Sequence, residues 1–430
     1  MEMTSPSHPD PGVHEDACLP QLIAWEVTRS CLLNCKHCRA AASRHVEANE
    51  FSTDECRKLL DNIASFAKPI IILTGGEPIL RADIYDIARY AHGLGLPVVM
   101  APCGVLLNDE TARKIVDSGI RRISLSLDGA TAETHDSFRG YPGSFDAVTS
   151  GIQAARRNGL DFQINTTISQ HNVAELPTIL ELVIALGASV FNPFLLVPTG
   201  RGKELAAWEL SAQQYEETLH WLAEQNRAGR IPIRVTCAPH YQRIVRTMGR
   251  STGVPPVSSM GVSPMSVAGV SPASSVSSSS SSSSAAAASA AASAAASAAA
   301  AEESHGQDAR ETHGRDGRAT GHPSTAGQTK GCMGGKGFAF VSHVGKVQIC
   351  GFLETECGDL RAANYDFQTI WRTSPVFLAM RDVDNYHDRC GYCEFRKVCG
   401  GCRARAYALT GDALAEEPFC AYQPKAGRAR

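Results

Sequence analysis

Three cysteines near the N-terminus, Cys31, Cys35 and Cys38, form a C-x3-C-x2-C array. They follow an apolar run with β-branched residues, which predicts a strand at residues 22–28. A structural zinc site uses four protein ligands and disulfides use cysteines in pairs, so three thiols suit neither. A [4Fe–4S] cluster is usually held by four thiolates, and a site with three leaves one iron free to bind a small molecule. The count therefore indicates a catalytic metal centre with an open position.

A second group of cysteines lies in the last hundred residues. Its spacing suits either structural zinc or iron–sulfur clusters, since both use four thiolates, and the local pattern leaves the two open. The chain has fifteen cysteines and no apolar segment typical of a secretory signal, so we expect a cytoplasmic protein with metal or redox chemistry. The group comprises Cys332, Cys350, Cys390, Cys393, Cys399, Cys402 and Cys420.

Length and charge exclude several classes of partner. The 430 residues carry a formal net charge of -3, and Lys and Arg are spread along the chain, so we expect no binding to nucleic acid. No run of about 18 apolar residues is present, which predicts no membrane-spanning helix and no membrane partner. The length is sufficient for a large buried core.

Short β-branched runs alternate with helical patterns from residue 22 to about residue 235. Six successive βα units predict a parallel sheet with right-handed crossovers, an α/β fold built as a partial (β/α)6 barrel. Ser52 begins one helix with the S-x-x-E pattern of a capping box. The expected strands are 22–28, 69–76, 96–102, 121–129, 161–168 and 188–197, with a further short strand at 231–236, and the expected helices are 52–67, 83–94, 109–119, 144–159, 173–187 and 211–229.

Distinctive short motifs follow the expected strands. The cysteine array follows the first strand, "GGEP" at residues 75–78 the second and "APCG" at residues 101–104 the third. Asp128 follows the fourth strand, and "NTT" at residues 165–167 ends the fifth. The carboxyl ends of parallel strands meet at one face of a barrel, so we expect these motifs to surround one mouth.

Composition divides the chain into four parts. We expect a disordered N-terminus at residues 1–20, the barrel at 21–249, a disordered Ser/Ala-rich insert at 250–330 and a cysteine-rich domain at 331–430. The alternating segment around Val344 and Gly345 predicts a β-hairpin at the start of that last domain, with His343 in solvent at its turn.

The cysteine array, followed one βα unit later by "GGEP", resembles the radical S-adenosylmethionine (SAM) enzymes. The resemblance implies that the three cysteines bind a [4Fe–4S] cluster and that SAM chelates its open iron through amino and carboxylate groups. Cys103 departs from the "APNG" usual in its loop and removes an amide expected to contact SAM. The resemblance implies SAM contacts from Gly75, Gly76, Glu77, Pro78, His37, Ser126, Arg139 and Asn165.

The C-terminal cysteines are similar to the SPASM extension of the same superfamily, which binds one or two auxiliary [4Fe–4S] clusters. The resemblance implies one cluster on Cys390, Cys393, Cys399 and Cys420. It also implies that Cys332, Cys350 and Cys402 contribute to another. For that second cluster, Cys357 could be the fourth ligand or a separate functional thiol.

Longer segments, among them "TCAPHYQRI", "GCMGGKGF" and "CGGCRARAYALTGDALAEEPFC", resemble the SAM-dependent heme synthases of the siroheme route. This resemblance implies an oxidoreductase that oxidatively decarboxylates two propionates of iron-coproporphyrin III to vinyls, giving heme b. It implies an iron-porphyrin substrate and a low-potential electron donor. The alternatives are an enzyme of iron-coproporphyrin III or heme d1 synthesis, a peptide or sulfatase maturase, and a non-enzymatic zinc or electron-transfer module.

A substrate with four carboxylates would suit a mouth furnished with arginines, because guanidinium groups bind carboxylates in pairs of hydrogen bonds. Candidates are Arg139, Arg201, Arg403 and Arg405, and His240 and Tyr241 are candidates to face the porphyrin iron. The alternative is that these are ordinary surface charges and a satisfied histidine.

Overall fold

The computed structural model describes residues 18–248 and 331–425. The expected N-terminal segment at 1–20 lies outside the described residues except for its last three, and the expected insert at 250–330 lies wholly outside them. Every helix in the two described ranges is too short or too polar to span a membrane.

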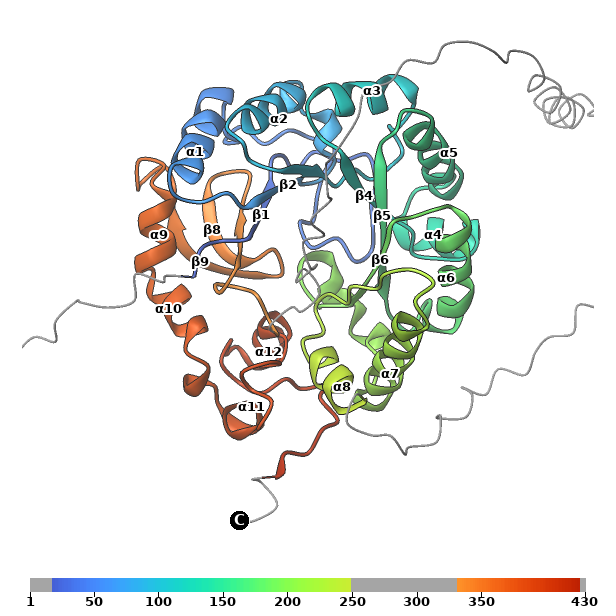
Figure 1. Cartoon of the computed structure of the whole chain (residues 1–430), viewed down its shortest axis with the longest axis vertical. Coiled ribbons are helices and arrows are strands. Elements are labelled where there is room, and N and C mark those ends of the chain that lie inside the picture. The colour runs from blue at the N-terminus through green and yellow to red at the C-terminus, as the bar shows by residue number, and fades with distance from the viewer. Residues whose placement is uncertain (1–17, 249–330, 426–430) are drawn as a thin grey trace, which may run out of the picture. The chain divides into compact units, whose positions relative to one another are not determined.

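One sheet runs through both described ranges, in the order β6-β5-β4-β3-β2-β1-β7-β8-β9 (Figure 1). Strands β1 to β6 are all parallel, which confirms the expected α/β architecture. At residues 231–236, where a further strand was expected, only two isolated bridges form, and Pro232 removes a ladder donor there. The six strands are β1 (Leu22–Glu26), β2 (Ile70–Thr74), β3 (Val98–Met100), β4 (Arg122–Ser126), β5 (Asp161–Ile168) and β6 (Val190–Leu195).

Helices follow these strands and lie outside the curve of the sheet (Figure 1). The expected capping box is confirmed: the Ser52 side chain accepts from the Glu55 backbone, and the Glu55 side chain accepts from the Ser52 backbone. Two short helices, α4 and α8, were not expected. The helices are α1 (Thr53–Phe66), α2 (Ile84–Gly93), α3 (Asp109–Asp117), α4 (Ala132–Arg139), α5 (Ser144–Arg157), α6 (Leu176–Ala185), α7 (Ala212–Ala228) and α8 (Tyr241–Met248).

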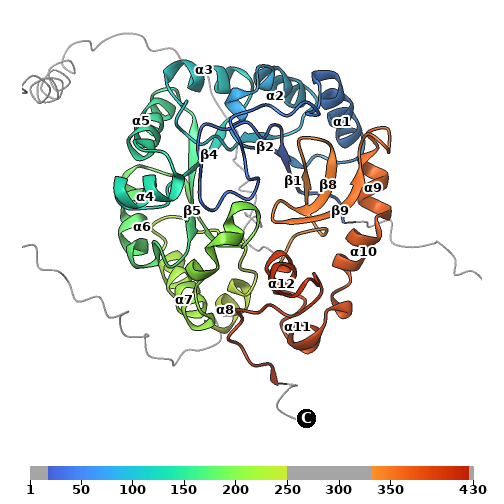
Figure 2. The ribbon, with the colours of Figure 1, turned by 180° about the vertical axis from the view of Figure 1, so that it is seen from behind.

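The expected C-terminal hairpin is confirmed, but it extends the barrel sheet. Strand β7 (Phe338–Val341) pairs in parallel with β1, and β8 (Lys346–Cys350) and β9 (Leu353–Asp359) continue antiparallel. Helices α9 (Phe367–Thr373) and α10 (Pro375–Arg381) lie beside β9 in both views (Figures 1 and 2). The cysteine-rich tail adds α11 (Asp388–Tyr392) and α12 (Arg403–Thr410).

A buried charge network joins the hairpin to the loop after β1. Glu26 is fully buried and accepts from Arg29 (2.9 Å) and Arg39 (2.8 Å), and it lies 2.8 Å from the His343 ring. Burial works against its charge, but Arg39, His343 and Arg29 outweigh burial and lower the pKa of Glu26 to about 2. The expectation of a solvated His343 is wrong, because its other ring nitrogen lies 2.7 Å from Glu47 and the side chain is 3% exposed.

The loops after β1 and β2 touch through their backbones. The Gly76 N–H donates to Thr28 (2.8 Å), and the Glu77 N–H donates to Ser30 (2.7 Å). A Cβ on Gly76 would lie 2.3 Å from the Ser30 oxygen, so no larger residue fits here without a backbone shift. This close approach holds "GGEP" against the start of the cysteine array.

We predict that Gly76→Ala lowers the free energy of unfolding by about 1–3 kcal/mol, because the added methyl overpacks a backbone contact. Gly93→Ala is the matched control, because Gly93 lies at the exposed end of α2 and no atom lies within 4 Å of a Cβ added there. This variant should raise the free energy of unfolding by about 0.5–1 kcal/mol, because alanine loses less backbone freedom on folding than glycine. Urea denaturation of the two variants measures the difference. Equal stability of the two variants would show that the contact imposes no constraint.

Candidate active site

The three cysteines of the array lie in the loop after β1, where Cys31 and Cys35 are buried and Cys38 is half-buried. They pack in a small cluster with Leu33, Ala40 and Ala42, against Cys103. Burial, with Glu77, Cys35 and Cys38 nearby, raises the pKa of Cys31 to about 11. A bound metal ion favours the thiolate form of such buried thiols, so this donor set suits an iron–sulfur cluster.

Asp128, directly after β4, organises the wall beside Cys35. It is fully buried, accepts from the Thr167 N–H (2.7 Å) and lies 2.7 Å from Arg139 at the end of α4. The other end of the Arg139 guanidinium lies 3.7 Å from the Cys35 sulfur. Its Nε is buried without a hydrogen-bond partner, so one donor remains for a ligand.

His37 stacks on Phe138 with 4.1 Å between ring centres, and its Nε2 lies 3.7 Å from Asp128. Burial, followed by the charges of Arg139 and His135, holds its pKa well below the usual range, so the imidazole is neutral. Its Nδ1 is buried without a partner. A neutral ring with one unused nitrogen therefore stands within the cysteine array.

Glu77 joins two of the loops. Its carboxylate is fully buried and accepts from the N–H of Ile79 (3.0 Å) and of Cys103 (2.6 Å). Burial raises its pKa. Both oxygens are therefore used within the protein, and Glu77 ties "GGEP" to "APCG". Pro78, also buried, begins the short helix Pro78–Leu80.

Ser126 and Asn165 lie at corresponding positions of neighbouring strands, β4 and β5. Both are half-buried. The side-chain oxygen of Asn165 accepts from the side-chain amides of Gln163 (3.0 Å) and Asn192 (3.1 Å), which fixes the orientation of the Asn165 side chain. As the strand pattern predicted, the cysteine array, "GGEP" and Asp128 follow the carboxyl ends of parallel strands, and Asn165, inside β5, lies level with the last residue of β4.

Three arginines considered for substrate carboxylates are bound to the protein itself. Arg201 donates to the backbone oxygens of Cys35 (2.9 Å) and Ala42 (2.8 Å), which supports the cysteine loop. Arg403 is buried and donates to the Ala415 oxygen (2.6 Å). Arg405 is fully buried and pairs with Glu417 at 3.2 Å. Arg403 and Arg405 are buried, so the alternative that they are surface charges is wrong. For the same reason they do not line an open mouth of the barrel.

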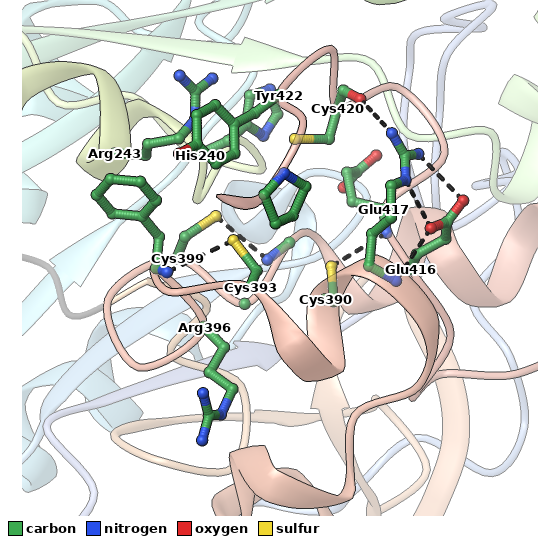
Figure 3. Close-up of a pocket in the computed structure, with 15 residues that line it drawn as sticks. His240, Arg243, Cys390, Cys393, Arg396, Cys399, Glu416, Glu417, Cys420 and Tyr422 are labelled. Carbon is green, nitrogen blue, oxygen red and sulfur yellow. Dashed lines mark hydrogen bonds and ion pairs between the residues drawn. The ribbon is translucent and has the colours of Figure 1, made fainter. Parts of the chain in front are cut away.

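Four C-terminal cysteines line one cavity, together with His240, Arg243 and Tyr422 (Figure 3). Backbone N–H groups of Phe395, Gly401 and Glu417 each lie 3.4 Å from a cysteine sulfur of this set. Such N–H···S contacts are typical of cluster environments. The set is the one expected from the sequence: Cys390, Cys393, Cys399 and Cys420.

The remaining three thiols interact with one another, and the structure adds a fourth. Burial, with Cys332 and Cys402 nearby, raises the pKa of Cys350 above its usual range. Cys237, to which the sequence assigned no role, lies beside Cys402, and this neighbouring thiol together with burial raises the pKa of Cys237. Cys357 lies elsewhere, near Ser374 and Arg381. The sequence signal for Cys237 was the segment "TCAPHY", which contains both Cys237 and His240.

Comparisons with known proteins agree with this geometry. The sequence pattern of the Radical SAM superfamily matches residues 25–183. An AdoMet-dependent heme synthase of Methanosarcina barkeri, AdoMet being SAM, is 42% identical over 94% of this chain and 97% of that protein. An Fe-coproporphyrin III synthase of the same organism is 34% identical over 48% of this chain and 51% of that protein.

Among solved structures, Streptococcus suis SuiB bound to S-adenosylmethionine has a TM-score of 0.62 at 12% identity, covering 94% of this chain and 78% of SuiB. That similarity shows the fold. The superfamily implies a [4Fe–4S] cluster and SAM, which the three-thiol array suits. From the near full-length match at 42% identity, the chain belongs to the AdoMet-dependent heme synthase family of radical SAM enzymes.

Proposed function

We propose that this enzyme converts two propionates of iron-coproporphyrin III into vinyl groups and thereby forms heme b. The observation that carries the proposal is the 42% identity with the Methanosarcina barkeri heme synthase over 97% of that protein. The Fe-coproporphyrin III synthase matches only half of each chain. We place the reaction in the cytoplasm, where a reducing environment keeps cysteines free for cluster binding.

When bound and reduced by one electron, the cluster with SAM supplies a carbon radical able to take a hydrogen atom from a propionate β-carbon. Each propionate then loses carbon dioxide and one electron, and a carbon–carbon double bond remains. The electron released from each propionate requires an acceptor, and an auxiliary cluster can serve as that acceptor. The electron that begins each cycle comes from a low-potential donor.

The residues of the array have distinct roles in this proposal. Cys31, Cys35 and Cys38 hold the cluster, and the backbone of Gly75, Gly76 and Pro78 faces the SAM amino group. Glu77 acts by fixing that backbone, because its carboxylate is bound to Ile79 and Cys103. In this proposal Ser126, Asn165 and Arg139 bind the polar groups of SAM, and the His37 ring lies beside the cluster; the half-burial of Ser126 and Asn165 at one level of neighbouring strands supports this.

We propose two auxiliary clusters, bound by cysteines of the domain at residues 331–430 and by one cysteine of the barrel domain at 21–249. The cavity of Cys390, Cys393, Cys399 and Cys420 holds the first. Cys332, Cys350 and Cys402 hold the second, with Cys237 as the fourth ligand in place of Cys357. The Cys237–Cys402 contact supports this choice, as does the position of Cys357 near Ser374.

We predict that the anaerobically reconstituted protein, given reductant, SAM and iron-coproporphyrin III, forms a porphyrin product that has lost carbon dioxide and a pair of hydrogen atoms from each of two propionates, as heme b requires. Mass spectrometry of the porphyrin measures this. Cys35→Ala should abolish the conversion, because the first cluster loses a ligand. Formation of deoxyadenosine without change of the porphyrin would contradict the heme assignment and favour a different substrate.

We predict that Cys237→Ala lowers the iron content of the reconstituted protein by up to about four atoms per chain, the content of one cluster. Cys357→Ala is the matched control and should keep the full content, because the neighbours of its thiol are Ser374 and Arg381. Iron and acid-labile sulfide analysis of the two variants compares them. Loss of iron in Cys357→Ala and retention in Cys237→Ala would reverse the assignment.

A further inference from the structure

His240 is fully buried, and neither of its ring nitrogens has a hydrogen-bond partner among the described residues. A neutral imidazole carries one N–H donor and one acceptor nitrogen. Buried polar groups nearly always find partners, so an imidazole with both nitrogens unused needs an explanation. The sequence made His240 a candidate to face the porphyrin iron. The ring is fully buried, so it does not lie at an open surface where a porphyrin would bind.

The surroundings of His240 fix its position. Its backbone oxygen accepts from the N–H groups of Arg243 and Ile244 at the start of α8. Its ring meets the Tyr215 ring edge-on, with 6.2 Å between centres. Tyr215 in turn lies under the Arg405 guanidinium and stacks on Phe419. The ring is therefore held among packed groups on one side and borders the four-cysteine cavity on the other (Figure 3).

Three of the cysteine sulfurs of this cavity already receive backbone N–H groups from residues of the C-terminal segment. Phe395 serves Cys393, Gly401 serves Cys399 and Glu417 serves Cys390, each at 3.4 Å. The imidazole N–H comes from a different element, the segment before α8. This N–H is an unused hydrogen-bond donor at the wall of the cavity. A cluster bound there would offer its sulfides as acceptors.

We propose that His240 donates a hydrogen bond to the auxiliary cluster held by Cys390, Cys393, Cys399 and Cys420 and thereby stabilises the reduced state of that cluster. Hydrogen bonds to cluster sulfur raise the reduction potential, because the added electron makes the sulfurs better acceptors. Arg403, 3.6 Å from the Cys390 sulfur, acts in the same direction through its charge. His240 thus tunes the reduction potential of this cluster.

The inference rests on the proposed function, in which this cavity holds a cluster. The [4Fe–4S] cluster takes up one electron and passes from the 2+ to the 1+ state, while the imidazole keeps its proton. In turnover the electron comes from the decarboxylating propionate, and in the test it comes from dithionite. A higher potential makes the cluster a better acceptor for the electron released from substrate.

The test is a redox titration of the full-length reconstituted protein, followed by electron paramagnetic resonance without porphyrin or turnover. The signal of this cluster is the one lost in Cys393→Ala. In His240→Phe, the ratio of reduced to oxidised cluster at a fixed potential should fall about tenfold, the effect of one hydrogen bond, which is 59 mV for a one-electron couple. Tyr215→Phe, which alters the neighbouring ring outside the cavity, should leave the ratio unchanged. An unchanged ratio in His240→Phe would overturn the proposal.

A measurement on the unmutated protein covers the case in which His240→Phe fails to fold. With 15N-labelled histidine, pulsed electron resonance at the signal that is lost in Cys393→Ala should show a weak nitrogen coupling, typical of an N–H···S contact; at this signal His37, beside the other cluster, does not contribute. A strong coupling would make His240 a ligand, and no coupling would leave it without contact; either overturns the proposal. Because no porphyrin is present, failure of heme synthesis does not affect this result. Absence of any signal dependent on Cys393 would instead remove the auxiliary cluster from the proposed function.

Discussion

The parallel pairing of β1 with β2 places the loop of the cysteine array against the "GGEP" loop, and the rest of the site depends on this contact. Gly76 and Glu77 donate backbone hydrogen bonds to Thr28 and Ser30, with no room for a side chain at Gly76. An open iron on three thiols is useful only if a ligand for it is held nearby. The two loops bring together the metal ligands and the backbone expected to bind the amino acid end of SAM.

Buried charges support both sides of this contact. On one side, Asp128 holds Arg139, which also reaches Cys35. On the other, Glu26 collects Arg29, Arg39 and His343 and so connects the cysteine loop to the hairpin of the C-terminal part. Removing one member of such a pair leaves an unpaired buried charge, which costs far more than a surface pair contributes. These pairs fix the side chains that surround the array, as pre-organised sites require.

Much of this arrangement follows from local sequence. Alternation of β-branched and amphipathic runs predicted the six parallel strands, and the capping box at Ser52 predicted the start of α1. The motifs after the strands then had to share one face. The expected set of Cys390, Cys393, Cys399 and Cys420 does line a single cavity.

Contacts between distant segments could not be predicted in this way. Strand β7 pairs with β1 although about 300 residues separate them, and no local pattern specifies that partner. For the same reason His343 was placed in solvent, although it meets Glu26 across that pairing. Cys237 approaches Cys402 from the far end of the barrel, whereas Cys357, nearer in sequence, does not. The internal partners of Arg405, at Glu417 and Leu196, likewise come from separate elements.

The central claim is that Cys31, Cys35 and Cys38 hold a cluster with one iron open to SAM. The most direct measurement is pulsed electron resonance of the reduced protein with SAM that carries 15N in its amino group. The account predicts a strong coupling of that nitrogen to the cluster, lost in a variant with all three cysteines changed to alanine. A reduced cluster whose spectrum does not respond to SAM would contradict it.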